Sequence, residues 1–218
     1  MIKYLNSSIG KKQLVAVSGL GMVLFLIAHL SGNFLMFKGA DALNAYSKML
    51  HDLGPLLWVA RIGLIGMFFL HFTLILILVI QNRKARDVQY SMPIYPKKRS
   101  LYTQTMRFSG LLIFVYIAVH LIDYTFTAST PTNAIVNGQF LGLYGLVYNS
   151  FLNPLRVVFY VLAMLSIGFH LNHGIQSVSQ TFGKTPSVTL KRVGICLGTL
   201  IALGFSSIPI YVLIIHYL

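Results

Sequence analysis

Five long apolar segments dominate this chain and restrict what it can fold into. Each is long enough to cross the hydrocarbon core of a bilayer, which takes about 20 apolar residues in a helix. Because lipid cannot satisfy backbone hydrogen bonds, a segment of this length crosses it as a helix. The sequence therefore predicts an all-α integral membrane protein, a single five-helix membrane domain over residues 1–218. The expected helices cover residues 13–37, 55–80, 106–127, 154–178 and 193–217.

The composition agrees with a protein whose surface faces lipid more than water. Of the 218 residues, 56% are hydrophobic and 10% are charged, and the mean hydropathy is +0.74. Soluble domains carry about 25% charged residues. The single cysteine, Cys196, allows neither an internal disulfide nor a cysteine-ligated metal cluster. We expect no second domain and no internal repeat.

The net charge of +13 is distributed as membrane topology requires. Lysines and arginines gather in the N-terminal segment and in the connections 82–105 and 184–192, whereas the alternate connections carry few. Such residues mark the cytoplasmic side of a membrane. We therefore expect a cytoplasmic N-terminus, an outer C-terminus and no nucleic-acid partner.

One histidine occurs in each of the first four apolar segments: His29, His71, His120 and His170. Ionisable residues inside a membrane span are costly and usually functional. Measured from the cytoplasmic ends of their helices, His71 and His170 lie about 14 and 15 Å deep, given the rise of an α-helix. On the same scale, His29 and His120 lie about 24 and 20 Å deep. The four histidines thus form two pairs at two depths, and each pair joins two helices.

Two imidazoles on opposite sides of one iron give a six-coordinate haem that is suited to electron transfer. The two pairs therefore predict two haems enclosed by the bundle. The alternatives are histidines that only hydrogen-bond between helices, or a proton relay. A relay usually recruits acidic partners, yet the chain has no glutamate and none of its four aspartates lies in the middle of a span.

Three stretches carry a resemblance to a known family. The first is SSIGKKQLVAVSGLGMVLFLIAHLSGNFLMF, with a small-residue pair about ten residues before His29. The second is NAYSKMLHDLGPLLWVARIGL, which is followed by LH at 70–71. The third is FHLNHGIQSVSQTFG, in which Gly174 and Gly183 follow His170 by four and thirteen residues. Together they resemble the dihaem cytochrome b (b558-type) membrane anchor of succinate dehydrogenase and fumarate reductase, the succinate:quinone oxidoreductases of respiratory complex II.

The resemblance implies a multi-pass protein of a bacterial inner (cytoplasmic) membrane with two haem b groups. Residue by residue, it implies that His71 and His170 ligate the iron of a proximal haem and that His29 and His120 ligate the iron of a distal haem. It further implies a flavoprotein subunit and an iron–sulfur subunit on the cytoplasmic side. Electrons would pass between these subunits, the haems and a membrane quinone, which we expect to be menaquinone.

The quinone is expected to react at the outer end, near the distal haem. The outer segment after His29 offers four polar candidates for binding its head or exchanging its protons: Asn33, Lys48, His51 and Asp52. Ordinary solvated loop residues are the alternative interpretation of His51 and Asp52. A cytoplasmic-side quinone site with Ser18 and Arg107 is the alternative location.

Two further expectations concern the partners and the limits of the chain. The N-terminal segment and the Asn82–Thr105 loop are expected to dock the soluble subunits. Without a dinucleotide-binding glycine motif or cluster-forming cysteines, the chain alone is not expected to oxidise succinate or reduce fumarate. Some fumarate reductases of the family carry a proton-transferring glutamate two residues before the last ligand, where this chain has Gly168. Other candidates are a dihaem cytochrome b of another respiratory complex and a haem-free anchor or transporter.

Overall fold

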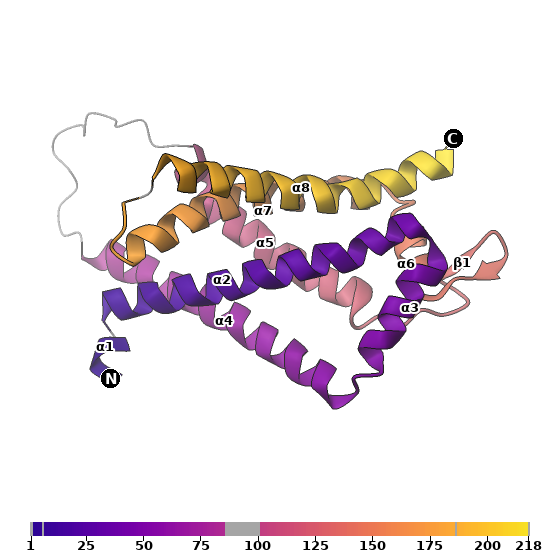
Figure 1. Cartoon of the computed structure of the whole chain (residues 1–218), viewed down its shortest axis with the longest axis horizontal. Coiled ribbons are helices and arrows are strands. Elements are labelled where there is room, and N and C mark those ends of the chain that lie inside the picture. The colour runs from indigo at the N-terminus through magenta and orange to yellow at the C-terminus, as the bar shows by residue number, and fades with distance from the viewer. Residues whose placement is uncertain (1, 6, 86–100, 186, 218) are drawn as a thin grey trace.

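The structure, a computed structural model, is a bundle of long helices that lie side by side (Figure 1). It describes residues 2–5, 7–85, 101–185 and 187–217, with all side chains in these ranges except those of residues 2, 101–105 and 107. The long helices are α2 (Ser8–Asn33), α4 (Pro55–Lys84), α5 (Leu101–Tyr124), α7 (Pro154–Thr181) and α8 (Val188–Tyr217). The short elements are α1 (Ile2–Leu5), the 3₁₀ helix η1 (Phe34–Lys38), α3 (Ala40–His51), the antiparallel strands β1 (Ile135–Val136) and β2 (Gln139–Phe140), and α6 (Gly142–Ser150).

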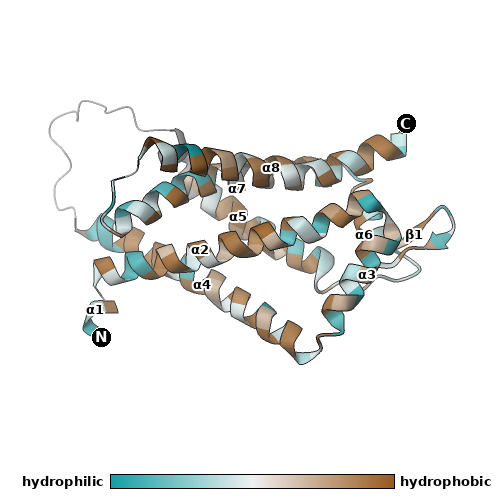
Figure 2. Ribbon diagram, in the orientation of Figure 1, coloured by the Kyte–Doolittle hydropathy of each residue, from teal (hydrophilic) through white to brown (hydrophobic). Residues whose placement is uncertain are grey.

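Four helical segments are long and apolar enough to cross a membrane: Ser8–Lys38, Pro55–Lys84, Pro154–Thr181 and Val188–Tyr217. Helix α5 contributes a shorter apolar stretch, Phe108–Tyr124. Hydrophobic residues occupy the middle of the long helices, and hydrophilic residues gather toward their ends (Figure 2). The expectation of an all-helical, multi-pass membrane protein is thereby confirmed, while the fifth span and the sidedness stay predictions.

Local sequence explains where the helices begin. The Ser7 hydroxyl oxygen accepts a hydrogen bond from the Gly10 amide, so α2 starts at Ser8, several residues before the expected start. Pro55 and Pro154 occupy the first turns of α4 and α7, where their missing amide hydrogens cost little. The Asn153 side chain also caps α7 by accepting from the amides of Leu155 and Arg156.

The bundle has two distinct ends (Figure 1). The N-terminal end holds α1, the last turn of α4 and the α7–α8 connection. The hairpin end holds η1, α3, the two strands and α6. These last elements replace the outer loops expected from the sequence. Two hydrogen bonds join α3 to α6. The Asn44 side-chain amide donates to the Leu141 carbonyl oxygen at 2.9 Å, and its oxygen accepts from the Tyr144 backbone amide at 3.2 Å.

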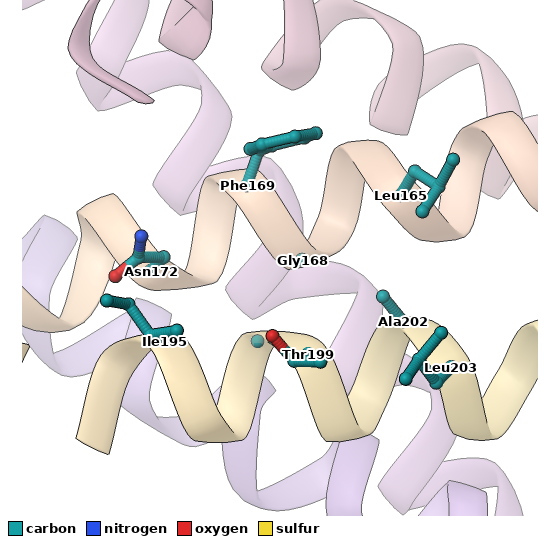
Figure 3. A pocket seen from close by; sticks show the side chains of 9 residues that line it. Leu165, Gly168, Phe169, Asn172, Ile195, Thr199, Ala202 and Leu203 are labelled. Carbon is teal, nitrogen blue, oxygen red and sulfur yellow. The ribbon is translucent and has the colours of Figure 1, made fainter. Parts of the chain in front are cut away.

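Close packing of α7 against α8 forms the core. A Cβ atom added to Gly168 would lie 2.9 Å from the Gly198 carbonyl oxygen, so the two backbones touch at this point (Figure 3). The buried apolar residues lie mainly on these two helices, among them Ala163, Ile201 and Val212. Helix α4 is different, because Leu78 is its single buried residue in the part of the chain that the structure describes.

Candidate haem-binding histidine pairs

The rings of His29 on α2 and His120 on α5 lie next to each other inside the bundle. Their centroids are 5.8 Å apart, and the rings are nearly perpendicular at 84°. Two imidazoles bound to one metal from opposite sides, with metal–nitrogen bonds of about 2 Å, have centroids about 6 Å apart. The separation therefore suits two axial ligands of one iron.

Aromatic side chains surround this pair. Phe25 stacks on His29 at 5.1 Å and 16°, and Tyr116 stacks on His120 at 5.5 Å and 28°. Phe205 of α8 approaches His29 at 5.7 Å, and Tyr124 approaches His120 at 5.3 Å. Such flat, apolar rings restrict the orientation of both imidazoles and exclude water from them.

His71 on α4 is held by α2. Its Nδ1 atom lies 3.1 Å from the Val15 carbonyl oxygen and 3.1 Å from the Ser18 hydroxyl oxygen. A carbonyl only accepts hydrogen bonds, so Nδ1 carries the proton. The neutral ring then keeps its lone pair on Nε2, where a metal binds. Gly19 lets the ring approach α2, since a Cβ at this position would lie 3.3 Å from the His71 Cε1 atom.

His170 on α7 is held by α5 in the same way. Its Nδ1 atom lies 3.4 Å from the Ser109 hydroxyl oxygen. Ser109 is buried, and a Cβ on the adjacent Gly110 would lie 3.7 Å from the His170 Cε1 atom. The structure thus brings His29 and His120 together and places His71 and His170 beside equivalent serines of α2 and α5, while the pairing of His71 with His170 stays a prediction.

The two pairs lie at different heights in the bundle. On α2, ten residues separate Gly19, which faces His71, from His29. On α5, ten residues separate Gly110, which faces His170, from His120. Ten residues of helix span about 15 Å. One pair is therefore near the N-terminal end and the other is nearer the hairpin end.

The two pairs occupy matching positions in two similar stretches of sequence, which we interpret as an internal repeat in a chain for which none was expected. The sequence SGL at 18–20 is followed by HL at 29–30, and SGL at 109–111 is followed by HL at 120–121. Likewise Pro55-Leu56 precedes His71 by sixteen residues, and Pro154-Leu155 precedes His170 by sixteen. Helices α2 and α4 form one copy, and α5 and α7 form the other. Each histidine pair takes equivalent residues from the two copies.

The repeat is weak in the sequence because the two copies share few identical residues. Leucine, isoleucine and valine replace one another freely in lipid-facing positions, which leaves the serine, glycine, proline and histidine positions as the signal. Aligning the apolar segments on their histidines would have revealed Ser18 and Ser109 as neighbours of the site.

The four quinone candidates each have contacts of their own, and their role in a quinone site stays a prediction. Lys48 and Asp52 form an ion pair of 2.8 Å on the exposed side of α3, and the exposed His51 lies with Nδ1 2.7 Å from the Ser47 carbonyl oxygen. Asn33 instead donates to the His29 carbonyl oxygen at 2.8 Å. Of the alternative location, Ser18 is buried against His71, while the side chain of Arg107 lies outside the described residues. So do residues 86–100 of the expected docking loop.

A buried carboxylate near the second pair was not predicted as part of a site. Asp123 follows His120 by three residues, and its side chain is only 10% exposed. Its carboxylate accepts a hydrogen bond from the Tyr160 hydroxyl at 2.6 Å and lies 3.3 Å from the Arg156 guanidinium. Asp123 lies near the end of a span rather than in its middle, and at such a position the sequence does not indicate a functional carboxylate.

Two cavities lie apart from the histidine pairs. One, of about 130 Å³, lies between α7 and α8 and is lined by Asn172, Thr199 and apolar neighbours (Figure 3). The other, of about 560 Å³, lies at the N-terminal end between Leu20, Phe182 and Lys184. Among the residues that the structure describes, no three His, Cys, Asp or Glu side chains form a metal-binding group. A haem iron needs only two protein ligands, so a histidine pair could hold one.

Fold and site together define a class: a multi-pass helical membrane protein with two internal histidine pairs. The chain is similar to the succinate dehydrogenase cytochrome b558 subunit of Bacillus subtilis (strain 168), with 23% identity over 183 residues that cover 84% of each chain. No family model and no solved structure matches it. The similarity supports the resemblance seen in the sequence, and the number of haems stays a prediction.

Proposed function

We propose that the chain is the cytochrome b membrane subunit of a succinate:quinone oxidoreductase and carries electrons through two bis-histidine haem b groups. The observation that supports this most directly is the repeat, which provides each haem with one histidine from each copy. His71 and His170 would hold the haem nearer the N-terminal end, and His29 and His120 the other. Haem iron, when bound there, supplies one-electron oxidation and reduction.

The side chains around the histidines have defined tasks in this function. Hydrogen bonds at Nδ1 of His71 and His170 would orient these rings and leave Nε2 free to bind haem iron. Phe25 and Tyr116 keep the other two rings in place and dry. Each histidine pair would hold one haem, and a haem held by two histidines would serve electron transfer rather than ligand binding.

The ends of the bundle would serve the two reaction partners. The N-terminal end is basic in its described part, with Lys11, Arg83 and Lys184, and would face the cytoplasm of a bacterial cell. There the flavoprotein and iron–sulfur subunits would dock, partly on the Asn82–Thr105 loop. A quinone, which we expect to be menaquinone, would react at the hairpin end near His29 and His120.

A spectrum of the purified protein tests the haems, and co-purification tests the complex. We expect sharp reduced bands and two haem b per chain, with a flavoprotein and an iron–sulfur protein retained on a tagged chain. A haem-free preparation would leave an anchor or transporter as the function. Two haems without a flavoprotein would instead favour a different respiratory complex.

A further inference from the structure

Two serine hydroxyls touch the two histidines of the pair nearer the N-terminal end. The Ser18 hydroxyl oxygen lies 3.1 Å from His71 Nδ1, and the Ser109 hydroxyl oxygen lies 3.4 Å from His170 Nδ1. The serines are 4% and 6% exposed, so water cannot replace them. Resting on the proposed function, we infer that Ser18 and Ser109 are positioning residues that set the reduction potential of this haem alone.

The direction of the hydrogen bonds follows from the other contacts of each serine. Ser18 donates its hydroxyl hydrogen to a carbonyl of its own helix, with the Leu14 oxygen at 2.8 Å. Ser109 donates to the Met106 carbonyl oxygen at 3.0 Å. The Val15 carbonyl requires a proton on His71 Nδ1, so the Ser18 hydroxyl oxygen accepts from this N–H. The inference assigns the same direction to Ser109 and His170, which leaves an unprotonated Nε2 atom on both rings.

The repeat makes the two serines equivalent. Each stands directly before a glycine that faces the ring: a Cβ at Gly19 would lie 3.3 Å from the His71 Cε1 atom, and a Cβ at Gly110 would lie 3.7 Å from the His170 Cε1 atom. In each copy, the first helix supplies the serine and glycine, and the second helix supplies the histidine. One haem thus receives two matched serine contacts, one on each side.

The other pair has different neighbours. The hydroxyl near the His120 Nδ1 atom, at 3.5 Å, belongs to Tyr116 one turn away on the same helix, and His29 is stacked on Phe25. Removing a serine should therefore affect the haem of His71 and His170 and leave the haem of His29 and His120 unchanged.

The sign of the effect follows from ligand basicity. An imidazole that donates from Nδ1 is a more basic ligand at Nε2. A more basic ligand stabilises ferric iron, which carries the larger charge, over ferrous iron. Loss of a serine acceptor should therefore raise the midpoint potential. Each tenfold change in the ratio of the histidine's affinities for ferric and ferrous haem corresponds to about 59 mV. Val15 still accepts from His71 in a Ser18→Ala variant, so the double variant should shift further than that single one.

The test is a potentiometric titration of the intact, haem-loaded protein, followed by optical and electron paramagnetic resonance spectra. We expect Ser18→Ala and Ser109→Ala each to raise the midpoint potential of the same haem. The rise should correspond to a several-fold change in the ratio of the histidine's affinities for ferric and ferrous haem. Both variants should also alter the low-spin signal of that haem. Ser18→Thr, which keeps the hydroxyl, should restore both properties. Ser31→Ala is the matched control, because Ser31 makes the same bond to its own helix at the Ile27 carbonyl but is exposed.

The outcomes separate the inference from the proposed function. A wild-type protein without haem would refute the proposed function. Haem-loaded alanine variants with unchanged potentials and spectra would refute the inference alone, and so would variants that each shift a different haem. Loss of one haem in Ser18→Ala, with recovery in Ser18→Thr and no loss in Ser31→Ala, would support the positioning role.

Discussion

At the scale of single residues, the spacing of ligands and their supports decides which histidine binds iron. His170 and His173 lie one turn apart on α7, yet His170 is the one whose Nδ1 contacts Ser109. It also occupies the position in the repeat that corresponds to His71. These two observations favour His170 as the ligand.

Substitution of the two neighbouring histidines tests this assignment. We expect His170→Ala to remove one of two haems, because the iron loses an axial ligand, and His173→Ala to retain both. Haem content per chain and the reduced-minus-oxidised spectrum measure the difference. The opposite result, with two haems in His170→Ala and one in His173→Ala, would show the assignment to be wrong.

The described residues also include a partly buried and an exposed ion pair, which should differ in their contribution to stability. Asp123→Ala removes the partner of Arg156 and the acceptor of Tyr160, and we expect the free energy of unfolding to fall by about 2 kcal/mol. This is less than for a fully buried pair because Arg156 is 38% exposed. Asp52→Ala breaks the exposed pair with Lys48 and should cost less than about 0.5 kcal/mol. Denaturation in detergent compares the two, and equal losses would contradict the prediction.

At the scale of helices, backbone contact between α7 and α8 depends on glycine. A Cβ on Gly198 would lie 2.5 Å from the Gly168 carbonyl oxygen, and backbone atoms cannot move aside as a flexible side chain can. We therefore expect Gly198→Val to separate the helices and lower the unfolding temperature in detergent by many degrees. Cys196→Val, on the exposed side of the same helix, is the control and should change little. A stable Gly198→Val protein would mean that the helices separate without cost.

The long helices and the four histidines could be predicted because hydrophobicity and helical rise are properties of short sequence segments. The ends of the bundle could not. Helix α3 carries one buried apolar residue, Leu43, among many polar ones, and its position depends on the contact between Asn44 and Leu141 almost a hundred residues away. Asp123 was missed because it lies near the end of a span and because its partners Arg156 and Tyr160 lie on another helix.

At the scale of the whole molecule, the two histidine pairs form a path along the bundle from the N-terminal end toward the hairpin end. Each pair joins the two copies of the repeat, so binding of haem would connect helices that the polypeptide alone holds loosely. Helix α4 would depend on this most, since most of its residues are exposed within the described part of the chain and Leu78 is its single buried residue there. The fold and the cofactors would then stabilise each other, as metal binding and folding commonly do.

This path predicts that turnover depends on the membrane potential. If electrons enter at a cytoplasmic N-terminal end and reduce a quinone at the hairpin end, they cross much of the membrane toward its positive side. A potential of 100 mV then assists each electron by up to about 2.3 kcal/mol. The chain has no glutamate to carry compensating protons across.

We therefore expect an uncoupler to slow succinate-dependent quinone reduction in sealed vesicles. The same uncoupler should have no effect on the detergent-solubilised complex, which experiences no potential and serves as the control. A quinone-analogue inhibitor should bind near His29 and His120 at the hairpin end and perturb the spectrum of that haem. An inhibitor bound beside Ser18 and Arg107, together with vesicle turnover that ignores the potential, would place the quinone site at the N-terminal end instead.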